Sequence, residues 1–322
     1  MYLLGIDTGG TTSECVVVDE KRRPLGIGDA GPGNYRVAGP DGARDHIECA
    51  ITEALEDAGI NPTSNLVGGF GMGTLDTDHD REVITGFLDD IHCIDQYYVT
   101  NDVVAAYYAF SAGGPGVVVI AGTGSMAFGR NEAGDEARSS GWGWLFGDEG
   151  SGFDTARRGL RAASKAFDGR GAETALERAA CEHFELGSFE DVFTGVLDEI
   201  EHAKEIASFA KPVAETAAAG DPVATNVVET AADELAEAAA AVIDQLGIEA
   251  TPLVSLQGGF GSADVVSSHF RDSIRSRYPD TRFATAVRNP VVGSIAFASL
   301  KQGNRVTRAE LASLDDSITS LR

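Results

Sequence analysis

The sequence is poor in positive charge, and above all in lysine. Only five of its 322 residues are lysines, and 25 lysines and arginines stand against 50 aspartates and glutamates, so the formal net charge is −25. Nucleic acids and anionic membranes attract clustered positive charge, so the sequence predicts neither as a partner. The acidic residues are spread along the chain rather than gathered in an interaction tail. This favours a protein that stays soluble in a salt-rich cytoplasm such as that of a halophilic archaeon.

Cysteine pairs and long apolar runs are also missing. The four cysteines are far apart and form no CxxC pair, which disfavours a zinc site and a disulfide framework and predicts a reducing, cytoplasmic environment. The N-terminal apolar run is short and broken by Asp7, unlike a signal peptide. The alanine-rich stretch at 231–246 carries four carboxylates, so we expect a water-exposed helix there rather than a membrane span.

Glycine, by contrast, is plentiful, and it gathers in turns between apolar strands. In LLGIDTGGTTSECVVVDE, strands at 3–6 and 14–18 flank a turn that is either a simple Gly-Gly hairpin or a cradle for phosphate. The stretch GVVVIAGTGSMAFGRNEAG at 116–134 repeats the order strand, glycine turn, strand. Two equivalent turns indicate a weak internal duplication, which a two-lobed protein would carry.

The remaining pattern predicts an α/β protein with two lobes. Strands at 24–30, 66–73 and 97–100 alternate with helices at 41–57, 78–88 and from about Asp102. Composition changes at Gly113-Gly114-Pro115-Gly116, a plausible boundary. We therefore predict an N-terminal lobe at 1–115, joined by a C-terminal helix at about 290–322, and a C-terminal lobe at 116–289. The second lobe contains a helical segment at about 151–247.

Five motifs in this order carry a resemblance to a known family: GIDTGGTTSECVVVD, TNDVVAAYYA, AGTGS, GWGWLFGDEGSG and LQGGFGS. The set resembles the N-acetylglucosamine kinase branch of the BadF/BadG/BcrA/BcrD ATPase family, in the sugar kinase/actin superfamily. The resemblance covers most of the chain, but the helical stretch from about Lys165 to Ala240 contributes little. It implies two ribonuclease-H-like, actin-like ATPase lobes with an ATP cleft between them, closing on hinges near 113–116 and Asn289.

The resemblance assigns ATP and Mg²⁺ as cofactors, with two phosphate turns and one adenosine-binding turn. Asp7 would hold Mg²⁺ through water, although a turn-capping aspartate is the alternative. The cofactor-binding residues implied are Gly9, Gly10, Thr11 and Thr12 in the first turn, Gly122, Thr123, Gly124 and Ser125 in the second, and Gly258 and Gly259 in the adenosine turn.

The resemblance also assigns a catalytic base and a sugar site. Asp102 would accept the proton of the attacking sugar hydroxyl, and its alternative role is to cap a helix. The substrate-binding residues implied are Asn34, Asn101, Gly141, Trp142, Gly143 and Asp148. Core packing is the alternative for the tryptophans, Trp144 is predicted to be core, and Asp148 could instead cap the following helix.

The predicted activity is ATP-dependent phosphorylation of an amino sugar, with N-acetylglucosamine first, glucosamine second and the 6-phosphate as product. A homodimer is a possible assembly. The rival within the family is an activator ATPase that holds an iron–sulfur cluster, which needs cysteines in glycine-rich turns, and none is found there. Another group of sugar kinases carries a cysteine-rich zinc motif, and this sequence does not contain such a motif. An actin-type regulator or filament protein would need no sugar pocket.

Overall fold

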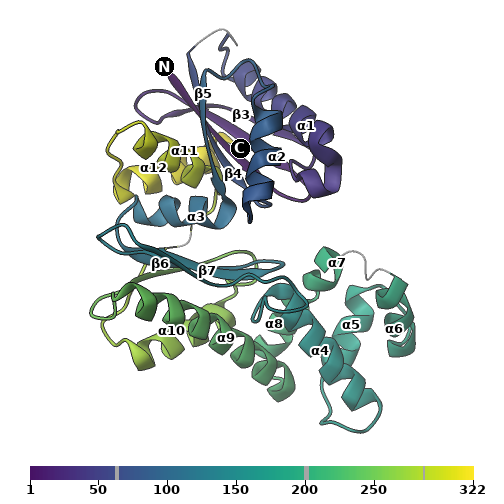
Figure 1. Cartoon of the computed structure of the whole chain (residues 1–322). Helices are drawn as coiled ribbons and strands as arrows, with labels where there is room; N and C mark the ends of the chain where they lie inside the picture. Colours follow the sequence, from purple (N-terminus) through teal and green to yellow (C-terminus); the bar gives the residue numbers. More distant parts are fainter. Residues whose placement is uncertain (62–64, 199–202, 286) are drawn as a thin grey trace. The chain divides into compact units, whose positions relative to one another are not determined.

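The computed structural model describes residues 1–61, 65–198, 203–285 and 287–322 (Figure 1). The chain folds into two compact units. Unit 1 comprises Met1–Gly114 and Val287–Arg322, and unit 2 comprises Pro115–Ala286. Each unit contains one five-stranded sheet with helices packed against it. Within the described residues, no helix has the length and the apolar run needed to cross a bilayer.

The sheet of unit 1 has the order β3-β2-β1-β4-β5. Its strands are β1 (Tyr2–Thr8), β2 (Ser13–Val18), β3 (Pro24–Ala30), β4 (Leu66–Met72) and β5 (Gln96–Asn101). Strands β1, β2 and β3 form an antiparallel meander, whereas β4 and β5 run parallel to β1. The carboxyl ends of β1, β4 and β5 therefore share one edge of the sheet.

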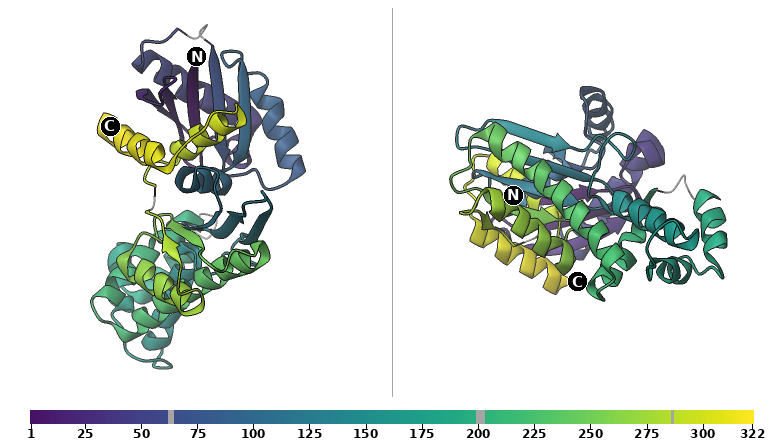
Figure 2. Two further views of the ribbon diagram at one scale, coloured as in Figure 1. Left: turned by 90° about the vertical axis from the view of Figure 1, so that its left-hand side faces the viewer. Right: turned by 90° about the horizontal axis from the view of Figure 1, so that it is seen from below.

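Helices cover both faces of this sheet (Figures 1 and 2). Helices α1 (Tyr35–Asp57) and α2 (Asp78–Leu88) pack on one face over apolar side chains such as Leu4 and Ile6. Helices α3 (Asp102–Ser111) and α11 (Val291–Lys301) cover the other face. A β-carbon at Gly69 would lie 2.1 Å from the carbonyl oxygen of Ser294, so glycine allows α11 to approach the strands directly.

Local capping explains where these helices begin. The predicted range of α2 is confirmed, and Thr77 with Asp80 forms a capping box at its start. Helix α1 begins six residues before the predicted start at Asp41, because the Asn34 side chain caps it and a break at Gly39 (φ 73°) precedes Pro40. The C-terminal segment is two helices rather than the predicted one. A left-handed turn at Gly303 ends α11, and Thr307 caps α12 (Arg308–Leu321).

Unit 2 repeats the strand topology of unit 1. Its sheet has the order β10-β9-β6-β7-β8, built from β6 (Gly116–Ala121), β7 (Ser125–Arg130), β8 (Glu136–Ser140), β9 (Leu253–Gln257) and β10 (Arg282–Phe283). Strands β6, β7 and β8 are antiparallel neighbours, and β9 and β10 run parallel to β6. This matches the meander and parallel pair of unit 1, so the predicted internal duplication is confirmed, with β6–β7 equivalent to β1–β2.

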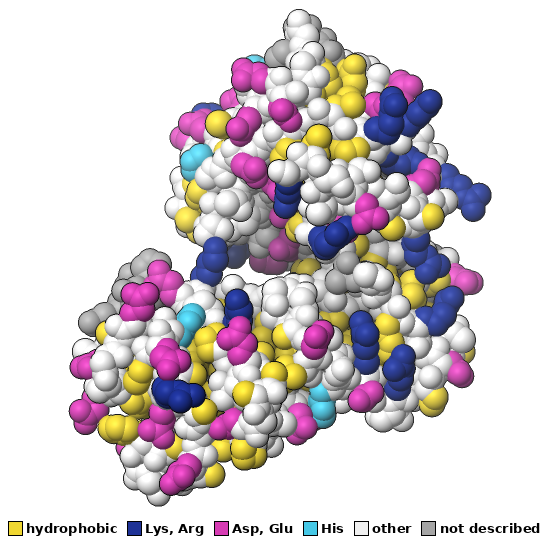
Figure 3. Space-filling view, turned by 180° about the vertical axis from the view of Figure 1, so that it is seen from behind, with side chains coloured by type: hydrophobic (Ala, Val, Ile, Leu, Met, Phe, Trp, Pro, Cys, Tyr) yellow, Lys and Arg dark blue, Asp and Glu magenta, His cyan; other side chains and the backbone are white. Residues whose placement is uncertain are grey.

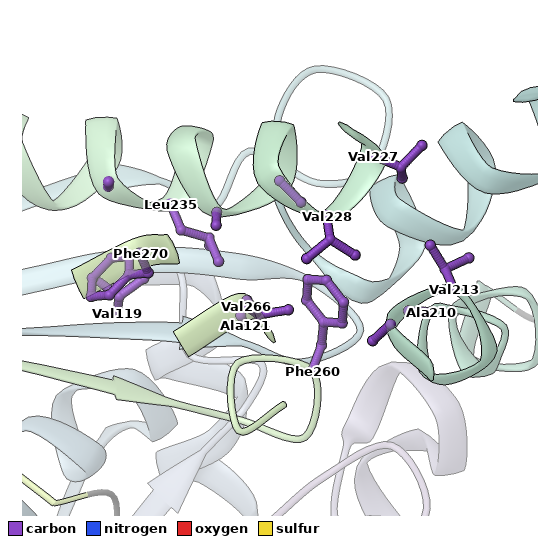
Figure 4. Packing of buried hydrophobic residues seen from close by; sticks show 14 of the residues in the cluster. Val119, Ala121, Ala210, Val213, Val227, Val228, Leu235, Phe260, Val266 and Phe270 are labelled. Carbon is purple, nitrogen blue, oxygen red and sulfur yellow. The ribbon is translucent and has the colours of Figure 1, made fainter. Parts of the chain in front are cut away.

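Between β8 and β9 the chain is helical. The helices are α4 (Gly152–Phe167), α5 (Leu176–His183), α6 (Phe189–Asp198), α7 (Ala203–Ser208), α8 (Ala210–Ala218) and α9 (Pro222–Leu246), and α10 (Asp264–Arg277) follows β9. Helix α9 lies along the sheet with α10 beside it (Figure 1). In the core between them, Phe260 and Val228 point toward each other (Figure 4). Alanine dominates the buried face of α9, which lets its backbone pack closely on the sheet.

Acidic side chains are distributed over both units on the face that Figure 3 shows, and they do not gather in one block there. This agrees with their spread along the sequence. The charge pattern therefore describes a solvated surface on this face.

Candidate functional site

Three strand ends in unit 1 bring the predicted acidic residues together. Asp7 in β1 pairs with Gly71 in β4, and Gly71 pairs with Thr100 in β5, so the three form one row across the sheet. Strands lie about 4.8 Å apart, which separates the backbones of Asp7 and Thr100 by about 10 Å. Asp102 follows two positions after Thr100, at the start of α3. The sheet register therefore places the predicted metal ligand and the predicted base at the same edge.

Asp102 is held by its neighbours but does not cap α3. The N-cap is Asn101, whose side-chain oxygen accepts the Val103 N–H at 2.8 Å. One Asp102 oxygen, Oδ1, also accepts from Val103, at 2.8 Å. The other oxygen, Oδ2, lies 3.3 Å from the position that a β-carbon at Gly73 would occupy. Glycine at 73 leaves room for this carboxylate at the strand ends.

The pKa values of both carboxylates, Asp7 and Asp102, are raised above the ordinary range of an aspartate. Burial, followed by repulsion from Asp102 and Glu14, raises the pKa of Asp7 to about 7. Burial and repulsion from Asp76 raise the pKa of Asp102, although the hydrogen bond from Val103 opposes them. Perturbed carboxylates that gather at strand ends are typical of functional sites.

Asp7 faces a second carboxylate that the sequence reading did not single out. Glu14 lies directly opposite Asp7 in the β1–β2 ladder, so the two side chains share one face. Glu14 pairs with Arg322 from the end of the chain. The Asp7 carboxylate accepts no hydrogen bond from any residue that the structure describes, which argues against the turn-capping alternative.

These carboxylates fit a hydrated magnesium ion. Mg²⁺ is usually held by one or two carboxylates together with water and substrate phosphates. Asp7 offers such a carboxylate, and repulsion from Asp102 and Glu14 would be relieved by a cation beside it. No cluster of three or more potential ligands occurs among the described residues, so a site made of protein ligands alone is not found there.

The first glycine turn, residues 9–12, is tight and open to solvent. The Gly9 N–H donates to the Thr12 carbonyl at 2.9 Å, while Gly10, Thr11 and Thr12 are exposed. A β-carbon at Gly10 would meet no atom of the described residues within 4 Å, and Gly10 has no positive φ. The fold itself therefore gives no reason for glycine at this position.

Asn34 is brought to the same end of unit 1. It precedes α1, and its Oδ1 accepts the N–H of Arg36 at 2.9 Å. The neighbouring Gly33 packs closely on β1 and β2, since its β-carbon would lie 2.8 Å from Thr8 Cβ. Asn34 thus has a capping role, and its Nδ2 donors remain for another partner because no described residue accepts from them.

The second glycine turn, residues 122–125, is bonded to the loop at 147–153 within unit 2. The Gly152 N–H donates to the Gly122 carbonyl at 2.8 Å, and Phe153 donates to Thr123 at 3.2 Å. The Ser125 hydroxyl is buried and donates to the Glu149 carbonyl at 2.8 Å. The Ser125 side chain therefore points inward and joins two predicted site loops.

The loop at 258–261 closes over the same turn. The N–H groups of Phe260 and Gly261 both donate to the Ala121 carbonyl at 3.1 Å. Gly258 has φ +96°, and its β-carbon would lie 2.4 Å from that carbonyl, so the fold requires glycine there. Gly122 and Gly259 behave like Gly10: an added β-carbon would meet nothing within 4 Å among the described residues, and neither has a positive φ. Each predicted nucleotide turn thus contains at least one glycine that the fold does not explain.

A cavity of about 860 Å³ in unit 2 joins the second glycine turn to the 258–261 loop. Its remaining walls come from α7, α8 and the start of α10, including Lys204, Lys211 and Asp264. Two of the five lysines of this acidic chain therefore line it. Sequence reasoning left this helical segment unassigned, and the scarcity of lysine was the signal that could have drawn attention to it.

The tryptophan-containing loop differs from expectation. Trp144 was predicted to be core, but it is 53 % exposed and Trp142 is 69 % exposed. The stretch is a turn rather than a strand, with Gly147 N–H donating to the Gly143 carbonyl at 2.8 Å, so strand alternation does not apply. Arg138 lies over the Trp142 ring at 5.1 Å. Core packing is therefore wrong for both rings.

Asp148 also does not cap a helix, because Ser151 is the N-cap of α4. Its backbone is left-handed, with φ 58°, a strained conformation for a residue with a side chain. Its Oδ2 lies 2.8 Å from the position that a β-carbon at Gly124 would take. Gly141, at the end of β8, has φ 75° and lies close to Met126. The strained turn thus holds a carboxylate beside the second glycine turn.

Two curated proteins are similar to this chain over most of its length. The chain is 28 % identical to the N-acetylmuramic acid/N-acetylglucosamine kinase of Clostridium acetobutylicum, over 92 % of this chain and 98 % of that protein. It is also 28 % identical to the N-acetyl-D-glucosamine kinase of Dictyostelium discoideum, over 92 % and 97 % of the two chains.

A solved structure supports the fold. The crystal structure of a provisionally named N-acetylglucosamine kinase from Chromobacterium violaceum matches with a TM-score of 0.76 and 23 % identity, over 92 % of this chain and 98 % of that chain. The predicted α/β fold of the actin-like sugar kinases is thereby confirmed. The model of the BadF/BadG/BcrA/BcrD ATPase family matches residues 4–298. The chain belongs to the BadF/BadG/BcrA/BcrD ATPase family.

Proposed function

We propose that this protein transfers the γ-phosphoryl group of ATP to the 6-hydroxyl of an amino sugar, with N-acetylglucosamine as first candidate and glucosamine as second. The protein is an ATP-dependent sugar kinase by its family and by curated kinases that match nearly its full length. The choice of sugar and of hydroxyl goes beyond this and is our proposal. A relative named glucosamine kinase, from Vibrio cholerae, matches 72 % of the chain at 25 % identity. This match supports glucosamine as the second candidate substrate.

The observation that carries the proposal is the Asp102 carboxylate at the strand edge. Its Oδ1 is fixed by the Val103 N–H, and its Oδ2 lies beside Gly73, 3.3 Å from the position that a β-carbon would take there. A fixed carboxylate oxygen can orient a hydroxyl and accept its proton as the oxygen attacks phosphorus. The new O–P bond forms as the bond from the γ-phosphorus to its bridging oxygen breaks. ADP leaves with those electrons, and Asp102 passes its proton to solvent.

The phosphate ligands come from backbone groups. Gly10, Gly122 and Gly259 are open positions in three turns, where N–H groups can reach phosphate oxygens without a side chain in the way. Bound Mg²⁺ would neutralise phosphate charge, with Asp7 as its carboxylate ligand. Phosphoryl transfer depends mainly on such positioning and charge neutralisation.

The proposed sugar contacts are polar side chains and one aromatic ring. Asn34 and Asn101 offer amides at the strand edge of unit 1, although Asn101 Nδ2 also donates to the Leu75 carbonyl at 3.3 Å and to Asp76 at 3.4 Å. In unit 2 the strained Asp148 offers a carboxylate, and the exposed Trp142 beside Gly141 and Gly143 offers a ring face. Sugar hydroxyls and ring faces call for this combination.

The test is sugar-dependent ADP release in molar KCl with magnesium and ATP. The panel comprises N-acetylglucosamine, glucosamine, N-acetylmannosamine, glucose and no sugar, each repeated with Asp102→Asn. Loss of a general base lowers kcat by about 10²–10⁴-fold. We expect one amino sugar to stimulate ADP release by the unmodified protein but not by the Asp102→Asn variant. The Kd of the variant for an ATP analogue should stay within about threefold of the unmodified protein's value, because Asp102 is assigned to the sugar hydroxyl and not to ATP. Asp90→Asn, an exposed aspartate, is the matched control.

Equal ADP release in every well would contradict the kinase and support an ATPase that serves another protein. The cluster-bearing activator within the family has little support in this structure. Cys15 is buried in β2, Cys49 and Cys181 lie in helices, and Cys93 lies between α2 and β5. None of them lies in a glycine turn.

A further inference from the structure

A second cavity in unit 2, of about 410 Å³, lies outside the proposed kinase site. It is formed by α4, the turn after α4 and the first turn of α9. Its lining residues are Arg158, Arg161, Ala162, Lys165, Gly171, Ala172 and Val223. The wall of the cavity is mainly apolar, three of its seven lining residues are cationic, and its lining includes no carboxylate from the described residues.

This concentration of positive charge is unusual in the chain. Residues 157–170 contain five of the 25 basic residues and a single acidic one, Asp168, although acidic residues outnumber basic ones two to one overall. Arg158, Arg161 and Lys165 recur at spacings of three and four, which places them on one face of α4. Selection for solubility in salt would not produce such a group.

The cations differ in how they are engaged. Arg158 donates to Asp154 at 2.7 Å and lies 3.5 Å from Glu234. Arg161 and Lys165 are exposed, and within the described part of the chain neither has an ion-pair partner. They are available to a ligand, and the guanidinium group of Arg161 can donate two hydrogen bonds to the oxygens of a phosphate.

The part of the cavity wall that α9 contributes does not repel an anion. Val223 is in the first turn of α9, where the positive end of a 25-residue helix points outward. Asp221, the N-cap of α9, is engaged by the N–H groups of Ala175, Val223 and Ala224. Its negative charge is therefore directed into the turn that it caps.

From this cavity we infer a second ligand site on unit 2, which binds a small phosphomonoester through Arg158, Arg161 and Lys165. Ala162, Ala172 and Val223 would contact the carbon skeleton of that ligand. The site is separate from the turns assigned to ATP and does not depend on the proposed function.

A chain of contacts links this site to the loop at 147–151. Arg158 Nε donates to Asp154 Oδ2 at 2.7 Å, and the same oxygen accepts the Gly150 N–H at 3.2 Å. Gly150 has φ 73° and is two residues from Asp148. A ligand that draws Arg158 toward its phosphate weakens the hold on Asp154 and so alters this loop. The site is therefore a regulatory one.

The sequence supplies an internal reporter for this coupling. The chain has two tryptophans, Trp142 and Trp144, and both lie in the exposed turn just before Gly147. Their fluorescence reports on the loop at 147–151 without any added label.

The test is a titration of the full chain with glucose 6-phosphate in molar KCl, followed by calorimetry and tryptophan fluorescence. At this ionic strength the Debye length is about 3 Å, which suppresses unspecific attraction. Glucose serves as the uncharged probe and inorganic phosphate as the probe without a carbon skeleton. The test variant is Arg161→Gln with Lys165→Gln. The matched control, Lys21→Gln with Arg178→Gln, removes the same charge at exposed positions elsewhere.

We expect saturable binding of glucose 6-phosphate with a fluorescence change, and at least a tenfold higher Kd in the test variant but not in the control. Glucose should not bind at this site, and inorganic phosphate should bind more weakly than glucose 6-phosphate. Binding that persists unchanged in the test variant belongs elsewhere and overturns the proposal. An equal loss in the control pair does the same, because it indicates net charge only. Normal binding without a fluorescence change would overturn the link to the loop.

Discussion

The Gly122→Ala substitution adds one methyl group at the second glycine turn, where the described chain leaves space for it. The native φ is not in the left-handed region, and the added β-carbon meets nothing within 4 Å among the described residues. Alanine in a compatible backbone conformation raises the free energy of unfolding by about 0.4–1 kcal/mol, because it restricts the unfolded chain. The melting temperature should therefore stay the same or rise by about 1–3 °C.

The effect on ATP should be opposite in sign. The Gly122 N–H itself donates to the Gly124 carbonyl at 2.9 Å, so the N–H groups that follow it in the turn are the ones assigned to phosphate. If phosphate oxygens approach those groups, the methyl group obstructs that approach and removes at least one hydrogen bond to a charged group. Such a bond contributes about 1.5–3 kcal/mol, so the Kd of a non-hydrolysable ATP analogue should rise about 10–150-fold. Calorimetric titration with magnesium, together with thermal unfolding of the same sample, measures both quantities.

Two other glycines serve as controls. Gly86 lies on the exposed side of α2, and a β-carbon there would, as at Gly122, meet no described atom within 4 Å. The Gly86→Ala substitution should therefore stabilise the protein by about 1 kcal/mol and leave ATP binding unchanged. Gly258→Ala should destabilise by about 2 kcal/mol or more, since φ is +96° and its β-carbon would lie 2.4 Å from the Ala121 carbonyl. Unchanged ATP affinity in Gly122→Ala, or a fall in its stability, would refute the reasoning.

Three further substitutions test the site. Asp7→Asn should raise the free energy of unfolding at pH 8 without magnesium by about 1–2 kcal/mol after allowance for solvent screening, but not at pH 4. The reason is that the raised folded-state pKa of Asp7, about 7, makes its ionisation between these pH values cost stability; equal gains at both pH values in urea unfolding would contradict this. Ser125→Ala breaks the bond between the second glycine turn and the neighbouring loop, so the KM values for ATP and sugar should both rise severalfold, whereas exposed Ser276→Ala should change neither. Asp154→Asn, at a 4 % exposed side chain facing two arginines, should cost about 3 kcal/mol in urea unfolding, and a cost as small as that of exposed Asp168→Asn would refute the buried-pair argument.

Much of the secondary structure follows from local sequence. The apolar runs of β1 and β2 and the range of β3 are close to prediction, because apolar patterning and turn glycines act over a few residues. The start of α2 is likewise fixed by Thr77 and Asp80, which are only three residues apart in the sequence. The strand β8 was missed, because EARSS is polar and its pairing with β7 places only part of it against the core.

Residues of the candidate site could be predicted where they belong to a recognisable sequence motif. Residues that reach the site only through tertiary packing could not be predicted. The roles of Asp7, Asp102 and the glycine turns were assigned from resemblance, and they remain predictions. The Asp7–Glu14 pair was missed because it depends on the register between two strands. The contribution of α7 and α8 to the large cavity was missed because it depends on how these helices pack beside the glycine turn.

The sequence by itself determined the alternation of strands and helices, the duplicated strand–turn–strand units and the acidic surface, since each arises from neighbouring residues or from composition. Only the tertiary structure decided that Trp142 and Trp144 are exposed, that the Ser125 hydroxyl points inward, and that three basic residues of α4 line one cavity. The physical reason is that burial, hydrogen-bond partners and pKa values depend on groups brought together from distant parts of the chain. A pattern along the sequence specifies a side chain, but the fold supplies its neighbours.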